Sequence, residues 1–195
     1  MLQSADTSKD AALREVGRTV VNFQRLEHNL KLAARLGPLQ GTLPKIQRDI
    51  ARRQERAETL TLGLAIQAWL KYCDGSEVVD AWTPDLFDYS FQMTFTLESD
   101  AESRNAHAAA LSNLLETRND LVHTRLARFP WDSPAECDSL IRDLTAINAT
   151  ISDQLDYVTS FMAQIVAAQK EHAEAVLAEV EAATQPMPNP SLERP

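Results

Sequence analysis

The chain has 195 residues, of which 44% are hydrophobic and only 5 are glycine, so we expect one domain with a sizeable core, built from helices rather than from a turn-rich β fold. A formal net charge of −9 at pH 7 argues against a general nucleic-acid binder, because phosphate binding depends on clustered lysine and arginine, but it leaves room for a local basic face. The polar N-terminus and the lack of a long apolar run predict a cytoplasmic protein with no signal peptide and no membrane partner.

The two cysteines, Cys73 and Cys137, lie far apart in the sequence and in no metal-ligand spacing. We therefore expect both to be buried apolar residues rather than a disulfide or a zinc site. No motif for a phosphate loop, a metalloprotease or a serine nucleophile occurs, and we expect neither a cofactor nor a metal.

The first predicted helix covers 9–36, where apolar residues recur every three or four positions. Gly37 and Pro38 should end it, because glycine accepts the left-handed cap conformation and proline cannot continue the helix. A second apolar stripe from Ile46 to Tyr72 predicts either one kinked helix or two abutting helices.

Residues 89–97 alternate between apolar and polar side chains and are rich in aromatic and β-branched types, which predicts a half-buried strand. A single strand cannot satisfy its own backbone groups, so it needs a partner. Residues 77–82 and the same strand of a second subunit are the two alternatives.

The third predicted helix begins at Ser99, where Ser99 and Glu102 have the spacing of a capping box. It continues to Arg128, and its apolar seam is Leu111, Leu115, Val122 and Leu126. A fourth helix begins at Ser133 and Pro134, and its apolar pattern extends toward Val180. The fold class is therefore an all-α, up-and-down helical bundle with one short strand or hairpin around 77–97, and the proline-rich stretch from Gln185 is a disordered tail.

The segment from Arg118 to His123 is the one place where the sequence looks able to perform chemistry. Arg118 falls on the apolar seam of the third helix, three residues after Leu115, where an arginine must be paired, reach solvent or face a cleft. Asn119 lies one turn before His123, so its amide can orient the imidazole or a bound phosphate.

An arginine followed by a polar residue, with a histidine five positions on and inside a late helix, resembles the Arg-x4-His signature of the HEPN domain superfamily. Asn119 strengthens the resemblance, because asparagine often follows that arginine in the family. The resemblance implies a HEPN-like helical bundle over 9–182 with an elongated last helix, flanked by disordered termini at 1–8 and 184–195. It also implies a metal-independent endoribonuclease of a toxin–antitoxin or other defence system, with Arg118, Asn119 and His123 in its catalytic site.

The chemistry fits these residue types. A ribonuclease of this kind must deprotonate a ribose 2′-OH, protonate the leaving 5′-oxygen and stabilise a negatively charged phosphorane. Histidine serves as base or acid near neutral pH, and the guanidinium fork matches two phosphate oxygens. One motif supplies one histidine, so we expect a homodimer that acts on RNA, with an antitoxin or another protein as a further partner.

In one HEPN subclass a tyrosine stands two residues after the histidine, and a partner antitoxin neutralises the toxin by modifying this tyrosine. This chain has Arg125 at that position, which argues against that mode of neutralisation.

The sequence also allows other roles for Arg118 and for the remaining arginines. Arg118 can instead be a buried residue paired with Glu116, Asp120 or Glu27, in a catalytically silent helical module for dimerisation and protein interaction. Glu27 can also orient Arg118 or His123. Four arginines at 48, 52, 53 and 56 are interleaved with acidic residues, which favours a solvated face with intrahelical ion pairs. Arg104, Arg118, Arg125 and Arg128 would have to converge for strong RNA binding.

Overall fold

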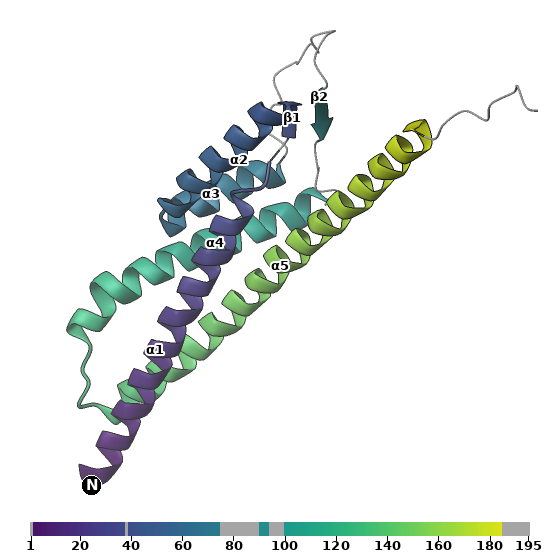
Figure 1. Cartoon of the computed structure of the whole chain (residues 1–195). Helices are drawn as coiled ribbons and strands as arrows, with labels where there is room; N and C mark the ends of the chain where they lie inside the picture. The colour runs from purple at the N-terminus through teal and green to yellow at the C-terminus, as the bar shows by residue number, and fades with distance from the viewer. Residues whose placement is uncertain (1, 38, 75–89, 94–99, 185–195) are drawn as a thin grey trace, which may run out of the picture. The chain divides into compact units, whose positions relative to one another are not determined.

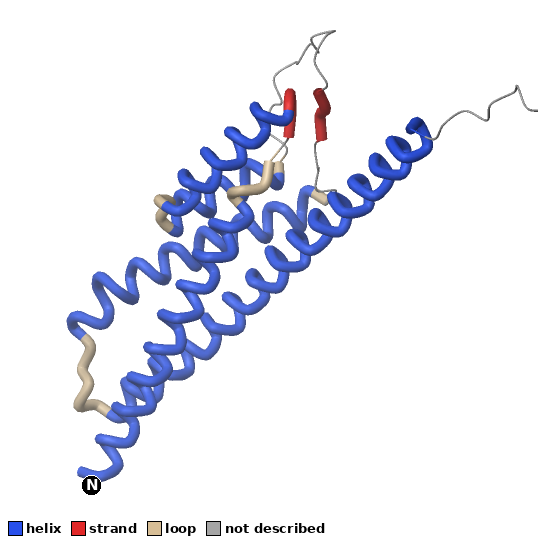
Figure 2. Tube along the Cα trace, viewed as in Figure 1, coloured by secondary structure: helices blue, strands red, loops and turns tan. Residues whose placement is uncertain are grey.

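A computed structural model describes residues 2–37, 39–74, 90–93 and 100–184, and these residues form an all-α fold, as predicted (Figures 1 and 2). The helices are α1 (Leu2–Ala33), α2 (Leu43–Glu58), α3 (Leu62–Cys73), α4 (Ala101–Asp120) and α5 (Pro134–Thr184), and the strands are β1 (Leu39–Thr42) and β2 (Ser90–Met93). The chain divides into two compact units, residues 1–159 and 160–195. The first contains every element except the second half of α5, which continues as helix to Thr184.

Helix α1 is longer at its start than the sequence predicted. It begins at Leu2 and not at residue 9, so the disorder expected at residues 1–8 is not found at residues 2–8; these residues include neither glycine nor proline, and the helix continues through them. The helix ends at Ala33 instead of Leu36. Its last turn tightens, since the N–H groups of Arg35 and Leu36 donate to carbonyls three residues earlier, which satisfies terminal groups that an α-helix would leave open.

The second apolar stripe forms two helices, α2 and α3, rather than one kinked helix. The break lies at residues 59–61, where Thr61 adopts an extended conformation and its hydroxyl accepts a 3.4 Å hydrogen bond from the backbone N–H of Leu64. An N-cap of this kind starts a new helix, because it satisfies one of the amide groups at the helix N-terminus. The turn at 59–61 positions the candidate site described below.

Strand β2 pairs with β1, antiparallel, with Gly41 opposite Phe91. This partner is neither of the two that the sequence suggested; residues 77–82, 89 and 94–97 lie outside the described ranges, and pairing with a second subunit stays a prediction. Strand β1 was not predicted from the sequence, because it is only four residues long. It also includes Gly41, whose φ of 113° is a left-handed conformation that favours glycine. The two strands pair through hydrogen bonds between backbone groups, and this pairing leaves no pattern in the side-chain sequence from which the partner could be predicted.

The N-cap of helix α4 lies one residue later than predicted. Its N-cap is Asp100, whose carboxylate accepts a 2.7 Å hydrogen bond from the backbone N–H of Ser103. This bond and a second one from the Ser103 hydroxyl hold the pKa of Asp100 below its usual value. Helix α5 begins at Pro134 as predicted, and the Ser133 hydroxyl accepts a 3.4 Å hydrogen bond from the N–H of Glu136.

The core of the first unit contains apolar side chains from α1, α3, α4 and α5. Fully buried members are Ala12, Leu26, Leu30, Ala65, Trp69, Leu111, Cys137, Leu140, Leu144, Ile151 and Val158. Both cysteines are buried free thiols, as predicted. A polar cluster fixes α1 against α5: the Asn148 amide donates to Glu15 at 2.8 Å and to Thr19 at 3.0 Å, and Asn22 donates to Asn148. None of the described helices combines the length and apolarity of a bilayer-spanning segment.

Candidate functional site

The helix that carries the Arg118–His123 motif changes its geometry within the motif. After α4 ends at Asp120, a π-helical turn, η1 (Leu121–Arg125), and a short 3-10 turn, η2 (Leu126–Arg128), complete it. The N–H of Leu126 donates to the carbonyl of Leu121, five residues earlier. In an α-helix these two leucines would point about 140° apart. The wider turn lets both face inward, Leu121 fully and Leu126 half-buried.

The seam of this helix differs from the predicted one. The buried residues of the helix are His107, Leu111, Leu114 and Leu121, whereas Val122, which was predicted on the seam, is 41% exposed. Arg118 lies between Leu114 and Leu121 in the same three- and four-residue series, so its seam position is as predicted. A π turn inside an α-helix often marks a functional site, and this one includes His123.

Arg118 is half-buried, and its guanidinium is held locally. Its Nη1 donates a 3.1 Å hydrogen bond to Oδ1 of Asn119. Among the described residues, no carboxylate forms an ion pair with Arg118, so the pairing with Glu116, Asp120 or Glu27 that the silent-module alternative requires is not formed. The amide of Asn119 therefore orients the guanidinium rather than the imidazole of His123.

Arg118 and Asn119 line a hollow of about 400 Å³ at the junction of α1, α3 and α4. We call it the Arg118 hollow, and its lining is Glu27, Leu60, Thr61, Leu62, Gly63, Leu115, Arg118 and Asn119. The absence of a side chain at Gly63 keeps the wall close, since a Cβ there would lie 3.3 Å from Cδ2 of Leu115. Glu27 lies in the hollow as the sequence allowed, but its ion pair, at 2.8 Å, is with Lys31.

His123 is exposed on the π turn and does not line the Arg118 hollow. No hydrogen bond joins its imidazole to a described side chain. One chain thus brings Arg118, Asn119 and Glu27 together but leaves His123 on the neighbouring surface. A histidine in this position is free to contact a ligand or a second subunit.

The four arginines considered for RNA binding do not converge on the Arg118 hollow. Arg104 and Arg118 are on the same helix, fourteen residues and therefore about 21 Å apart. Arg125 forms a 2.5 Å ion pair with Asp143 on α5. Only Arg118 of this set lines the hollow.

The residues that complete the hollow opposite Arg118 could not be predicted from the sequence. Leu60, Thr61 and Gly63 come from the turn between α2 and α3, and they become neighbours of α4 only through helix packing. One local signal was present: the sequence Thr61-Leu62-Gly63 interrupts the helical pattern. It indicates that a helix ends there, but it does not indicate which other helix packs against that turn.

Comparisons with models of protein families, with curated proteins and with solved structures gave no match to this chain. The resemblance to the HEPN superfamily therefore stays a prediction from the motif. Within the described ranges, no three histidine, cysteine, aspartate or glutamate side chains gather as a metal site would require.

Proposed function

We propose that this chain is a metal-independent endoribonuclease of the HEPN type, active as a homodimer and belonging to a toxin–antitoxin or other defence system. The observation that carries the proposal is the state of Arg118: a half-buried arginine, oriented by Asn119, at the edge of a hollow and without a carboxylate partner among the residues that the structure describes. An arginine in that state keeps its fork available for an anion, and phosphate oxygens match the geometry of the fork.

The proposed reaction is transesterification within RNA. The ribose 2′-oxygen forms a bond to phosphorus, the bond from phosphorus to the 5′-oxygen breaks, and one His123 accepts the 2′-OH proton while the second subunit's equivalent donates a proton to the 5′-oxygen. Arg118 binds the phosphorane oxygens, where negative charge develops. Asn119 acts as a positioning residue, because it holds the guanidinium through the 3.1 Å hydrogen bond.

The homodimer is part of the proposal for a chemical reason. One chain supplies one exposed His123 on a π turn, and the reaction needs both a base and an acid. A two-fold axis beside the π turn would place two imidazoles on one phosphodiester. The antitoxin or other protein partner is proposed on the resemblance alone.

The experiment is RNA cleavage by the purified protein in the presence of EDTA. We expect cleavage by the wild type and its loss in both His123→Ala and Arg118→Ala. Two control variants, His172→Ala and Arg142→Ala, remove an exposed histidine and an exposed arginine elsewhere and should cleave like the wild type. Circular dichroism and sedimentation check that all four variants fold and dimerise equally.

Two results would contradict the proposal. The first is a folded wild type that cleaves no RNA, and the second is cleavage that the Arg118 and His123 variants retain, which would assign it to a contaminant or another site. Either result favours the alternative, a silent helical module for dimerisation and protein interaction. That alternative requires a protein partner instead of an RNA substrate.

A further inference from the structure

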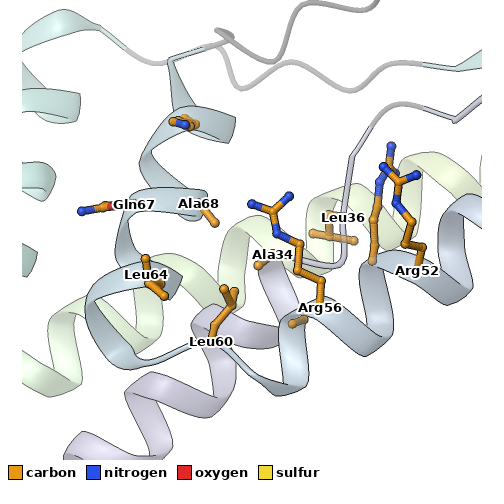
Figure 3. A pocket seen from close by; sticks show the side chains of 11 residues that line it. Ala34, Leu36, Arg52, Arg56, Leu60, Leu64, Gln67 and Ala68 are labelled. Atoms are coloured by element: carbon orange, nitrogen blue, oxygen red, sulfur yellow. The ribbon is translucent and has the colours of Figure 1, made fainter.

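A second hollow of the first unit, also of about 400 Å³, lies between α2, α3 and the end of α1. Figure 3 shows it from close by. Four cationic residues line it, Arg52, Arg53 and Arg56 from α2 and Lys71 from α3, and none of its lining residues is acidic. Its other lining is mainly aliphatic, including Ala34, Leu36 and Leu64. We call it the basic pocket.

The arginines of α2 are not neutralised in the way that the sequence predicted. Arg52 and Arg56 form no ion pair with a carboxylate of the described residues. Glu58, one of the acidic residues expected to pair with them, instead lies 3.9 Å from Arg35 at the end of α1. The interpretation of this cluster as a face of intrahelical ion pairs is therefore wrong for these two arginines.

Helix geometry gathers the cations on one side. Arg52 and Arg56 are one turn apart and so share a face of α2, and Figure 3 shows both extending to the same side of that helix. Arg53 is half-buried, and its guanidinium packs against Gly37, where an added Cβ would lie 2.8 Å from Nη1. Lys71 closes the set from α3. Arg52 and Arg56, which form no ion pair with a described carboxylate, therefore border a hollow with no carboxylate among its lining residues, and such a surface attracts an anion.

The lining also indicates which anion. No aromatic side chain is among the lining residues, so a nucleobase has no ring on which to stack. A ligand held here is held by its phosphates. Arg52 and Arg56 are exposed, which suits an extended backbone that passes along the pocket better than a small anion enclosed in it.

The basic pocket adjoins the Arg118 hollow. Leu60, in the turn between α2 and α3, lines both of them. An extended ligand whose phosphates lie against Arg52 and Arg56 can therefore pass Leu60 and reach Arg118. The cations that RNA binding requires are supplied by α2 and α3, although the arginines of the motif helix do not converge.

We propose that the basic pocket binds consecutive phosphates of a single-stranded RNA and directs that strand to Arg118. This proposal rests on the proposed ribonuclease function. It specifies the substrate class of that ribonuclease, single-stranded RNA, and the surface that holds the substrate. It assigns Arg52 and Arg56 to substrate binding rather than to catalysis.

The test measures binding separately from cleavage. A fluorescent 2′-O-methyl RNA oligonucleotide has no free 2′-OH and cannot be cleaved, so its anisotropy reports binding alone. It is titrated with wild type, Arg52→Gln, Arg56→Gln and the control Arg48→Gln at several salt concentrations. Each variant loses one positive charge from α2, glutamine keeps helix propensity, and Arg48 is an exposed residue that does not line the pocket.

We expect Arg52→Gln and Arg56→Gln each to weaken binding about threefold to tenfold and to reduce the slope of log affinity against log salt by about 0.7, the value for one single-strand phosphate contact. Arg48→Gln should bind like the wild type. Equal affinities for all three variants, or no binding by the wild type, would overturn the proposal. Binding of inorganic pyrophosphate that depends on Arg56, without oligonucleotide binding, would overturn it too and assign the pocket to a free polyphosphate.

The two proposals fail in different ways. If the oligonucleotide binds with the expected arginine dependence but RNA is never cleaved, the pocket binds RNA and the ribonuclease proposal falls. If RNA is cleaved in an Arg118-dependent manner while Arg52→Gln and Arg56→Gln bind and cleave like Arg48→Gln, the catalytic proposal holds and the pocket proposal falls.

Discussion

The indole Nε1 of Trp69 donates a 2.6 Å hydrogen bond to Nε2 of His107. Both residues are buried, and the ring of Tyr157 stacks on the imidazole with a centroid distance of 4.1 Å. Because Nε2 accepts this bond, the neutral imidazole carries its proton on Nδ1. The pair joins α3 to α4 in the core, and protonation of His107 would remove the acceptor.

Stability should therefore depend on pH through His107. Burial lowers the pKa of His107 below its ordinary value, and the side chain of Gln154 opposes this with a smaller effect. The unfolded chain then binds the proton more readily, so the contribution of His107 is complete above about pH 6.5 and is lost as the pH falls from there toward the pKa of the folded state.

Urea unfolding at several pH values between neutral and mildly acidic checks this. The free energy of unfolding of the wild type should fall over that range more steeply than that of His107→Gln, whatever the absolute stability of the variant. His28→Gln, which changes an exposed histidine, is the control and should keep the steeper dependence. Parallel curves for wild type and His107→Gln would refute the argument.

The π turn makes a prediction about two adjacent residues. Leu121 is 2% exposed and Val122 is 41% exposed, the reverse of what a regular helix with the predicted seam requires. Leu121→Ala should cost about 2–5 kcal/mol of unfolding free energy, because it leaves a cavity in the core. Val122→Ala should change it by no more than about 0.5 kcal/mol. Chemical denaturation of both variants checks this, and a larger cost for Val122→Ala would show that Val122 rather than Leu121 faces the core.

The thiol of Cys73 should be unreactive in the folded protein. Burial raises its pKa to about 12, the neighbouring charge of Asp74 adds to the effect, and Arg104 opposes it. The thiolate is the reactive form, so at pH 8 a disulfide reagent such as DTNB should leave Cys73 intact until urea unfolds the chain. The variant Cys73→Ser shows which part of the DTNB signal comes from Cys73. In Cys137→Ser, Cys73 is the remaining cysteine, and rapid labelling of this variant in its native state would contradict the burial of Cys73.

Arg118→Lys tests whether the guanidinium fork matters beyond its charge. Lysine keeps the positive charge but has a single donor group, which cannot bind two phosphate oxygens in a fork and cannot keep the geometry toward Asn119. If the proposed ribonuclease is correct, single-turnover cleavage should slow by about 100-fold to 1,000-fold. Arg142→Lys is the matched control on an exposed residue. A lysine variant within threefold of the wild-type rate would mean that Arg118 acts only as a point charge.

Much of the fold could be predicted because it follows from local patterns. The three- and four-residue spacing of apolar side chains indicated the helices, Ser133 and Pro134 indicated the start of α5, and the buried state of both cysteines followed from their composition and spacing. These features depend on helix periodicity and capping, which a stretch of sequence contains by itself.

Other features were decided by the tertiary structure. The partner of β2 is β1, because backbone groups distant in the sequence pair without a side-chain signature. The π turn allows Leu121 and Leu126 both to face the core side, and Val122 and His123 are exposed beside it. The Arg118 hollow and the basic pocket combine residues of separate helices that meet at Leu60. The sequence by itself thus determined the helices and the Arg118, Asn119 and His123 motif, whereas packing between helices decided what each of these side chains faces, because such contacts join residues far apart in the chain.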